Sequence, residues 1–243
     1  LGNGYETMIF VAWCLSLLAL GIGRRFPIAA ASGLLMSGFA LLVASLGMAN
    51  PQITPLVPVL RSPWLSLHVS LIMVSYALLG LLMLNGTAAL ALAAAARAGT
   101  AERTSRTLAR LRLFGRLLLY PAVFLLTAGI FTGAVWANAS WGRYWGWDPK
   151  EVWALITLIV YALPLHEQSL ARFRRPLFFH AYTLWAFAAV LMTYFGVNYF
   201  LGGMHSYGGG FRPEYAAATV FAAVTAFALL TVAALIRQRR MDT

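Results

Sequence analysis

The chain has 243 residues, of which 61% are hydrophobic and only 10% are charged. Soluble domains carry about 25% charged residues, so this composition excludes an ordinary water-exposed surface. The single cysteine, Cys14, excludes an internal disulfide, a cysteine-rich zinc site, an iron–sulfur cluster and a C-x-x-C-H attachment motif. The net charge of +11 comes from basic residues scattered among loops, so nucleic acid is not an expected partner.

Seven apolar stretches are long enough to cross a lipid bilayer, and they cover residues 6–23, 27–48, 64–96, 114–136, 151–166, 177–200 and 215–236. A hydrocarbon core about 30 Å thick needs roughly 20 apolar helical residues. The sequence predicts an all-α fold, a polytopic transmembrane helical bundle of about seven spans in a single domain over residues 1–243. Because the chain begins with Leu1 and shows no signal-peptide pattern, we expect a fragment of a longer protein.

The distribution of arginine and lysine predicts the topology. Fourteen of the 18 basic residues fall in alternate connections, within residues 24–25, 97–116, 172–175 and 237–240. Connections rich in basic residues stay in the cytoplasm. The N-terminus is therefore predicted to lie outside and the C-terminus in the cytoplasm. On this topology the outer connections cover residues 49–63, 137–150 and 201–214.

The outer connection around residues 136–153 contains five of the eight tryptophans. An aromatic belt at the depth of the lipid headgroups accounts for part of this cluster. It does not explain why Gly142 and Gly146 interrupt the cluster, where small residues let a flat ligand approach the backbone. If the segment is helical, Trp141 and Trp145 share a face. We interpret this tryptophan-rich loop as a haem-binding platform, because a planar apolar surface of this size suits a porphyrin.

The loop ends in Asp148-Pro149-Lys150-Glu151, which has the pattern of a helix start. Asp at the N-cap, Pro at the first helical position and Glu two positions later form a capping box that begins the fifth span. Lys150 and Arg143 are in addition candidates to pair with a haem propionate, as a cation pairs with a carboxylate.

Two of the four histidines lie on the predicted outer side, with the tryptophans. His68 is one turn inside the third span, and His205 is in the connection 201–214. A lone interfacial histidine is usually an ordinary polar residue, but imidazole is the common axial ligand of haem iron. If the third and sixth spans are neighbours, the two histidines could ligate one iron from opposite sides.

The other two histidines lie toward the predicted cytoplasmic side. His166 is 15 residues beyond Glu151, which places it about 22 Å deeper along the fifth helix. An ionisable residue at membrane depth is a functional candidate, and Pro164 beside it is expected to open the helix locally. We interpret His180 as an ordinary interfacial histidine.

Several linked motifs resemble one family over nearly the whole chain. Trp141-Gly142-x-x-Trp145-x-Trp147-Asp148 resembles the WWD motif of the CcsA/ResC-type proteins of system II cytochrome c biogenesis, and its Asp-Pro-Lys-Glu ending differs from that of CcmC-type proteins. The segments Gly4–Thr7, Leu67–Ser70 and Thr193–Asn198, running into His205-Ser206-Tyr207, are also similar to this family.

The resemblance implies a haem-handling site. On this basis His68 and His205 are the outer axial ligands of haem b, and His166 is a ligand on the transmembrane route of the haem. The platform that cradles the haem consists of Trp141, Gly142, Trp145, Trp147 and Asp148. His180 falls on no motif position.

The resemblance also implies the activity and the partners. A CcsB/ResB-type membrane protein, separate or fused, supplies the second transmembrane histidine. The pair forms a cytochrome c haem lyase or synthase that joins haem to the CxxCH segment of apocytochrome c. No side chain of this chain is then a catalytic nucleophile, because the thiols come from the substrate.

Two other functions stay open from the residues alone. One is a haem carrier or exporter without synthase activity, and the other is a haem-bearing anchor subunit of a respiratory oxidoreductase. A secondary transporter is not favoured because there is no inverted repeat. Abundant alanine and the use of arginine over lysine favour a bacterial inner (plasma) membrane over a thylakoid, with the active face extracytoplasmic.

Overall fold

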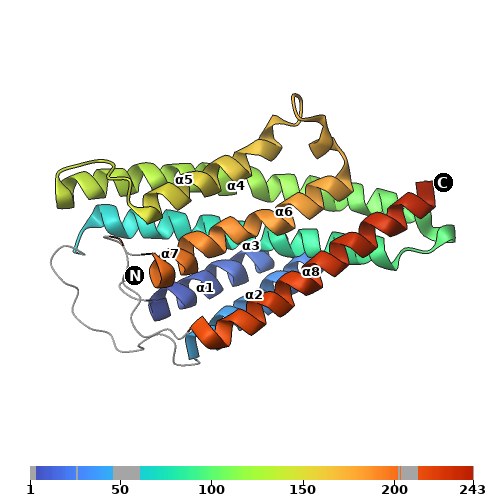
Figure 1. Ribbon diagram of the computed structural model, residues 1–243, viewed down its shortest axis with the longest axis horizontal. Helices are drawn as coiled ribbons and strands as arrows, with labels where there is room; N and C mark the ends of the chain where they lie inside the picture. Colours follow the sequence, from blue (N-terminus) through green and yellow to red (C-terminus); the bar gives the residue numbers. More distant parts are fainter. Residues whose placement is uncertain (1–3, 26, 46–60, 202, 204–212, 243) are drawn as a thin grey trace.

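The computed structural model describes residues 4–25, 27–45, 61–201, 203 and 213–242, and confirms the predicted all-α fold class (Figure 1). Short 3₁₀ turns cover Ala98–Thr100, Leu163–His166 and Ala171–Arg174, and a π-helical turn covers Met192–Gly196. The α-helices are α1 (Gly4–Ile22), α2 (Pro27–Ser45), α3 (Pro63–Ala95), α4 (Ala101–Trp141), α5 (Pro149–Ala162), α6 (Pro176–Leu191), α7 (Val197–Phe200) and α8 (Pro213–Asp242).

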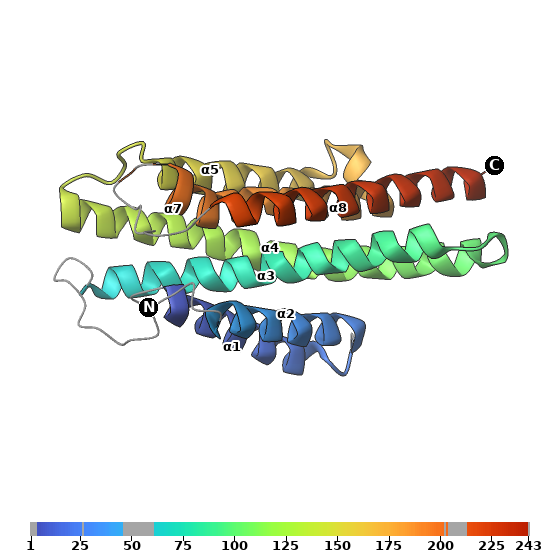
Figure 2. The same cartoon turned by 60° about the horizontal axis from the view of Figure 1, so that its bottom comes forward.

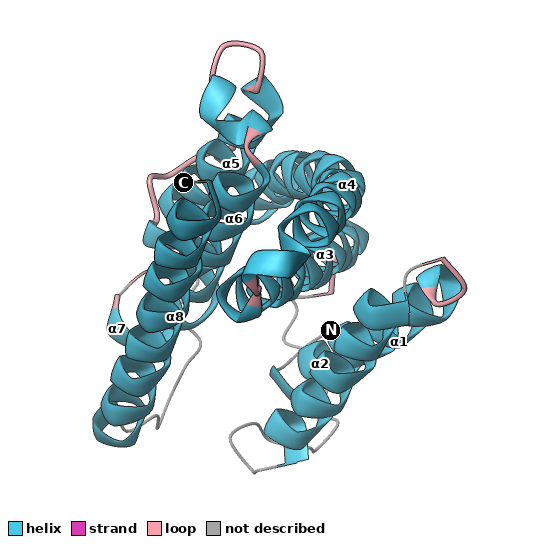
Figure 3. Ribbon diagram, turned by 90° about the vertical axis from the view of Figure 1, so that its right-hand side faces the viewer, coloured by secondary structure: helices cyan, strands magenta, loops and turns pink. Residues whose placement is uncertain are grey.

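The antiparallel helices α3 and α4 form the central pair of the bundle, and the other helices pack around this pair. α1 and α2 form a hairpin on one side of α3, whereas α6 and α8 contact another side of α3 (Figures 2 and 3). The main apolar core joins side chains of α1, α3, α4, α5 and α6. As a result the start of α3, the end of α4, the start of α5 and α7 all lie at one end of the bundle (Figure 1).

Four of the described helical segments are long and apolar enough to cross a membrane: Pro63–Ala95, Ala101–Trp141, Pro176–Gly196 and Thr219–Arg240. Shorter apolar stretches, Tyr5–Gly21 and Ala30–Leu42, lie in the α1–α2 hairpin. The chain is therefore a multi-pass membrane protein. The exact number of crossings and their orientation stay predictions.

α4 is much longer than the predicted span of residues 114–136. It begins at Ala101 within the arginine-rich connection and continues through the first tryptophans of the loop. Its first turns are amphipathic: Thr104 and Leu108 are buried, while Arg103 and Arg106 are exposed. Its 41 residues give a length of about 60 Å, which is about twice the thickness of the hydrocarbon core of a bilayer.

The sixth predicted span is interrupted by the π-helical turn Met192–Gly196. The Thr193 hydroxyl lies 2.7 Å from the carbonyl oxygen of Ala189 and 2.9 Å from the Thr157 hydroxyl on α5. The Thr157 hydroxyl also donates to the carbonyl of Trp153. This buried polar contact joins α5 to α6 where the helix changes its winding, and α7 follows directly.

Candidate functional site

The tryptophan-rich loop leaves the helical conformation at Gly142. Gly142 has a left-handed φ of 71°, and its N–H donates to the carbonyl of Asn138 at 2.9 Å, which ends α4 at Trp141. Glycine is favoured at such a helix end because it lacks a Cβ. The helical condition under which Trp141 and Trp145 share a face is therefore not met.

The tryptophans instead form two edge-to-face pairs. Trp141 pairs with the buried Trp136 at a ring-centroid distance of 4.8 Å. Trp145 pairs with Trp147 at 5.9 Å, with their planes at 89°. The first pair anchors the end of α4 in the bundle, and the second lies in the loop itself.

The predicted capping box at the start of α5 is confirmed. The Asp148 carboxylate accepts the N–H of Lys150 at 3.0 Å. The Glu151 carboxylate accepts two backbone N–H groups, from Gly146 at 2.7 Å and from Asp148 at 3.2 Å. The end of the loop is thus tied to the first turn of the helix by side chains that lie two to five residues from the groups that they bind.

Trp147 lies between those two N–H groups in a strained conformation. Its φ of 57° makes it the one described residue other than glycine with a positive φ. For a bulky side chain this region costs about 1–2 kcal/mol and persists only where the surroundings enforce it. Trp147 is 73% exposed and Tyr144 is 61% exposed. An aromatic surface held outward at a conformational cost is typical of a ligand site.

The two side chains predicted to contact the propionates, Lys150 and Arg143, both make contacts within the protein. The Lys150 ammonium donates to the Asn198 side-chain oxygen at 2.8 Å, and Asn198 in turn donates to the carbonyl of Tyr194 at 2.6 Å. Burial lowers the pKa of Lys150, which precedes the apolar part of α5, to about 8, although the Asp148 carboxylate opposes this shift. The Arg143 guanidinium lies over Gly146, where an added Cβ would be 2.8 Å from its carbon. Their contact with a propionate stays a prediction.

His68 lies at the same end of the bundle as the loop. It is in the second turn of α3, partly buried, and its Nδ1 is 2.6 Å from the carbonyl oxygen of Gly129 on α4. His205 lies outside the described residues. Of the residues that lead toward it, Leu201 and Gly203 are described, and a Cβ added at Gly203 would meet the Asp148 carboxylate.

His166 lies at the opposite end of α5. The α-helix ends at Ala162, and Leu163–His166 continue as a 3₁₀ turn that contains Pro164, so the predicted opening of the helix is confirmed. The His166 side chain is exposed, with its Nδ1 3.0 Å from the carbonyl oxygen of Ala162.

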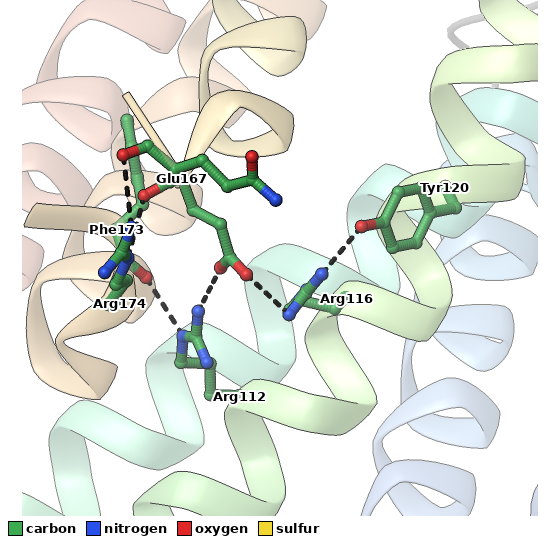
Figure 4. Close-up of polar contacts among 7 residues, drawn as sticks. Arg112, Arg116, Tyr120, Glu167, Phe173 and Arg174 are labelled. Atoms are coloured by element: carbon green, nitrogen blue, oxygen red, sulfur yellow. Dashed lines mark hydrogen bonds and ion pairs between the residues drawn. The ribbon is translucent and has the colours of Figure 1, made fainter. Parts of the chain in front are cut away.

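An ion-pair clamp next to His166 was not predicted (Figure 4). The Glu167 carboxylate pairs with Arg112 and, at 2.8 Å, with Arg116, both on α4. The Arg112 Nε also donates to the carbonyl of Phe173 at 3.0 Å, and the Arg174 Nε donates to the carbonyl of Glu167 at 3.0 Å. One feature of the sequence could have indicated this clamp: Glu167 is the only acidic residue between Glu151 and Glu214.

His180 differs from its interpretation as an ordinary interfacial histidine. Its exposed fraction is 0%, and its Nε2 is 3.3 Å from the carbonyl oxygen of Leu108 on α4. At Gly86 of α3 an added Cβ would come within 2.7 Å of the His180 carbonyl oxygen. His180 is buried because α3, α4 and α6 meet around it.

The described residues therefore place two groups at separate ends. The tryptophan-rich loop, α7 and the start of α3, which carries His68, share one end, and the turn after α5, which carries His166 and Glu167, lies away from it (Figure 1). Among the described residues there is no cluster of three or more histidine, cysteine or acidic side chains placed to hold a metal ion. The arrangement instead combines a single imidazole with an exposed aromatic surface.

Comparison with known proteins places residues 1–205 in the family described as Cytochrome C assembly protein. Protein NrfI of Wolinella succinogenes is 41% identical over 210 residues, which cover 86% of this chain and 23% of that protein. The cytochrome c biogenesis protein CcsA of Chlamydomonas reinhardtii is 36% identical over 219 residues, covering 86% and 60% respectively. CcsA of a Synechococcus strain is 36% identical over 247 residues, covering 86% and 76%. The chain thus spans only part of these relatives.

Proposed function

Because this chain belongs to the cytochrome c assembly protein family, we propose that it binds haem b at its extracytoplasmic face and takes part in attaching that haem to apocytochrome c. The observation that carries the proposal is the strained, exposed Trp147 beside Trp145, at the end of the bundle that also holds His68. An exposed aromatic surface at the same end of the bundle as an imidazole suits a flat iron porphyrin.

The residues present fit haem as a substrate. The ring of His68 places Nδ1 against a carbonyl, as metal-ligating histidines commonly do, so that Nε2 is the nitrogen suited to iron. His205 is proposed as the ligand on the opposite side. Trp141, Gly142, Trp145, Trp147 and Asp148 form the platform, and Arg143 and Lys150 are proposed to contact the propionates.

The attachment chemistry needs no nucleophile from this chain. Each cysteine thiol of the CxxCH segment adds across one haem vinyl group, so that sulfur bonds to the carbon next to the ring and hydrogen to the outer carbon. The addition needs no external oxidant or reductant. The histidine of CxxCH then replaces one protein imidazole at the iron. This chain contributes by orienting the reactants, which can lower a barrier by about 7–11 kcal/mol.

Haem is proposed to reach the outer site through His166, with a second transmembrane histidine from a CcsB/ResB-type partner. The exposed position of His166 at the far end of α5 supports such a route. The membrane is proposed to be a bacterial inner membrane because alanine is abundant and arginine is used over lysine. The N-terminus is proposed to lie outside and the C-terminus in the cytoplasm, because the arginines cluster in alternate connections.

The test is the absorption spectrum of the chain purified with its CcsB/ResB-type partner from haem-replete cells. We expect a low-spin bis-histidine spectrum, which His68→Ala and His205→Ala each abolish. An unchanged spectrum and haem content in both variants would eliminate the ligand pair, and a colourless wild-type complex would eliminate haem binding.

Co-expression with an apocytochrome separates attachment from carriage. A synthase and its partner should yield covalently bound cytochrome, and the yield should fall in the His68 and His205 variants. Normal haem binding without any covalent product would instead support the carrier or exporter.

A further inference from the structure

We propose that Gly129 and Gly133 of α4 form a notch that positions His68 for haem, with Gly133 making room for the ring and the Gly129 carbonyl selecting the nitrogen that faces iron. This inference rests on the proposed role of His68 as an axial ligand. It assigns a function to two residues that have no chemistry of their own. Neither glycine belongs to the motifs that indicated the site.

The notch is defined by how closely α3 lies against the two glycines. A Cβ added at Gly133 would be 2.6 Å from Nδ1 and 2.7 Å from Cε1 of His68. A Cβ added at Gly129 would be 2.6 Å from Cδ1 of Ile72 and 3.3 Å from its backbone nitrogen. Because residues four apart share a helix face, the pair Gly129 and Gly133 receives the pair Ile72 and His68.

The hydrogen bond within the notch determines the tautomer of the ring. The Gly129 carbonyl can only accept, so His68 Nδ1, at 2.6 Å, carries the hydrogen. In the neutral ring Nε2 then has no proton and presents its lone pair, which is the form that binds a metal. A backbone carbonyl on the second nitrogen fixes both the tautomer and the rotation of the ring.

The glycines are needed because a ligand site tolerates little displacement. A methyl group at position 133 would overlap the ring directly, so either the ring or α3, which also packs Ile72 against Gly129, would have to shift. Ligand geometry usually has to be held within about 0.5 Å, so the shift required to relieve this overlap is large enough to weaken the iron bond.

A purely structural role is the main alternative, and the same helix offers a matched control. Gly115 also lies on α4 against tightly packed neighbours, where an added Cβ would be 2.8 Å from Phe179, 3.1 Å from Asn85 and 3.2 Å from Leu82. It is far from His68 along α4. At Gly38 of α2 an added Cβ meets nothing within 4 Å, so Gly38→Ala controls for substitution in a membrane helix.

The experiment compares Gly133→Ala, Gly115→Ala, Gly38→Ala and His68→Ala in the full chain, purified with its partner. For Gly133→Ala we expect a loss of the low-spin spectrum and a haem affinity weaker by about 10-fold or more, the usual effect of losing support for a metal ligand. Added imidazole should restore the low-spin spectrum. Gly115→Ala should lower thermal stability but keep the spectrum per bound haem, and Gly38→Ala should match wild type.

A double variant covers the case in which Gly133→Ala accumulates poorly. Removing the ring removes the overlap, so in a His68→Gly background Gly133→Ala should not lower the accumulation of the protein any further. Added imidazole should restore low-spin haem in this double variant. If the double variant accumulates no better than Gly133→Ala alone, the ring is not what the methyl group meets, and the proposal is overturned.

The outcomes separate this inference from the proposed function. If His68→Ala keeps the wild-type spectrum, His68 is not a ligand and the proposed site itself is wrong. If His68→Ala loses the spectrum while Gly133→Ala keeps it, or changes it no more than Gly115→Ala does, the site stands and the notch has only a packing role.

Discussion

Glu151 holds Trp147 in a conformation that tryptophan rarely adopts. Its carboxylate binds the N–H groups on either side of Trp147, from Gly146 and Asp148, and so closes the backbone around a φ of 57°. The strain of about 1–2 kcal/mol is comparable to the stabilisation from the capping box, so the box can offset the strain. One carboxylate thereby starts a helix and turns an indole ring outward.

Replacing Glu151 with alanine should therefore release Trp147. Glu151→Ala removes Oε2, which accepts both N–H groups, and should destabilise the chain by about 1–2 kcal/mol, whereas Glu151→Gln retains one acceptor oxygen and should lose less. Thermal unfolding measures the stability, and tryptophan fluorescence together with haem retention reports the loop. Equal haem retention in wild type and Glu151→Ala would show that the platform does not depend on this carboxylate.

Lys150 joins the start of α5 to α7, because its ammonium donates to the side-chain oxygen of Asn198. Lys150→Met removes a charged donor from a partly buried site, and we expect a loss of about 1.5–3 kcal/mol. Asn198→Ala removes the acceptor from the other side and should lower thermal stability similarly. If the two losses add fully in the double variant, the contact contributes nothing of its own.

At the scale of elements, Glu167 ties the connection between α5 and α6 to α4. Its two ion pairs are partly buried, with side-chain exposures of 17% for Arg112, 30% for Arg116 and 20% for Glu167. Such pairs are worth more than exposed ones, because removing one partner leaves the others without compensation. The turn that carries His166 immediately precedes Glu167 in the chain, so the clamp also holds that turn.

Glu167→Gln should lower the stability of the chain by about 1–3 kcal/mol and increase hydrogen exchange across residues 163–175. α4 offers a matched control, because Glu102 pairs with Arg106 four residues away on an exposed surface. Glu102→Gln should leave both measurements unchanged. Equal effects of the two substitutions would mean that Glu167 is an ordinary surface charge.

At the scale of the whole molecule, the α3–α4 pair separates two chemically different ends. The aromatic loop and His68 lie at one end, while Arg97, Arg103 and Arg106 lie around the turn that joins the two helices at the other (Figure 1). A bilayer orients such a molecule, because basic connections remain in the cytoplasm. On the topology proposed above, the tryptophan-rich loop is extracytoplasmic.

Cysteine labelling measures this orientation directly. Cys14 is buried and provides a low background, while Ala139 near the loop and Thr100 at the α3–α4 turn are exposed. In intact cells a membrane-impermeant maleimide should label Ala139→Cys and not Thr100→Cys, and after lysis it should label both. The reverse pattern would contradict the proposed topology.

Local signals within the sequence were sufficient to predict the helical elements and the capping box. Apolar length, prolines at helix starts and the Asp148–Glu151 box act over a few residues, so they are readable without knowing the fold. The approximate positions of the long apolar helices and the end of α5 before Pro164 follow from them, whereas the number of membrane crossings stays a prediction. The tryptophan cluster and the histidines were visible in the same way, although their roles were not.

Only the tertiary structure decided how those residues are held. His68 meets Gly129 across 61 residues, and Arg112 meets Glu167 across 55. The burial of His180 and the length of α4 likewise depend on which helices pack together. Periodicity and hydropathy carry no information on such distant partners, because the energy of these contacts exists only once the helices have met.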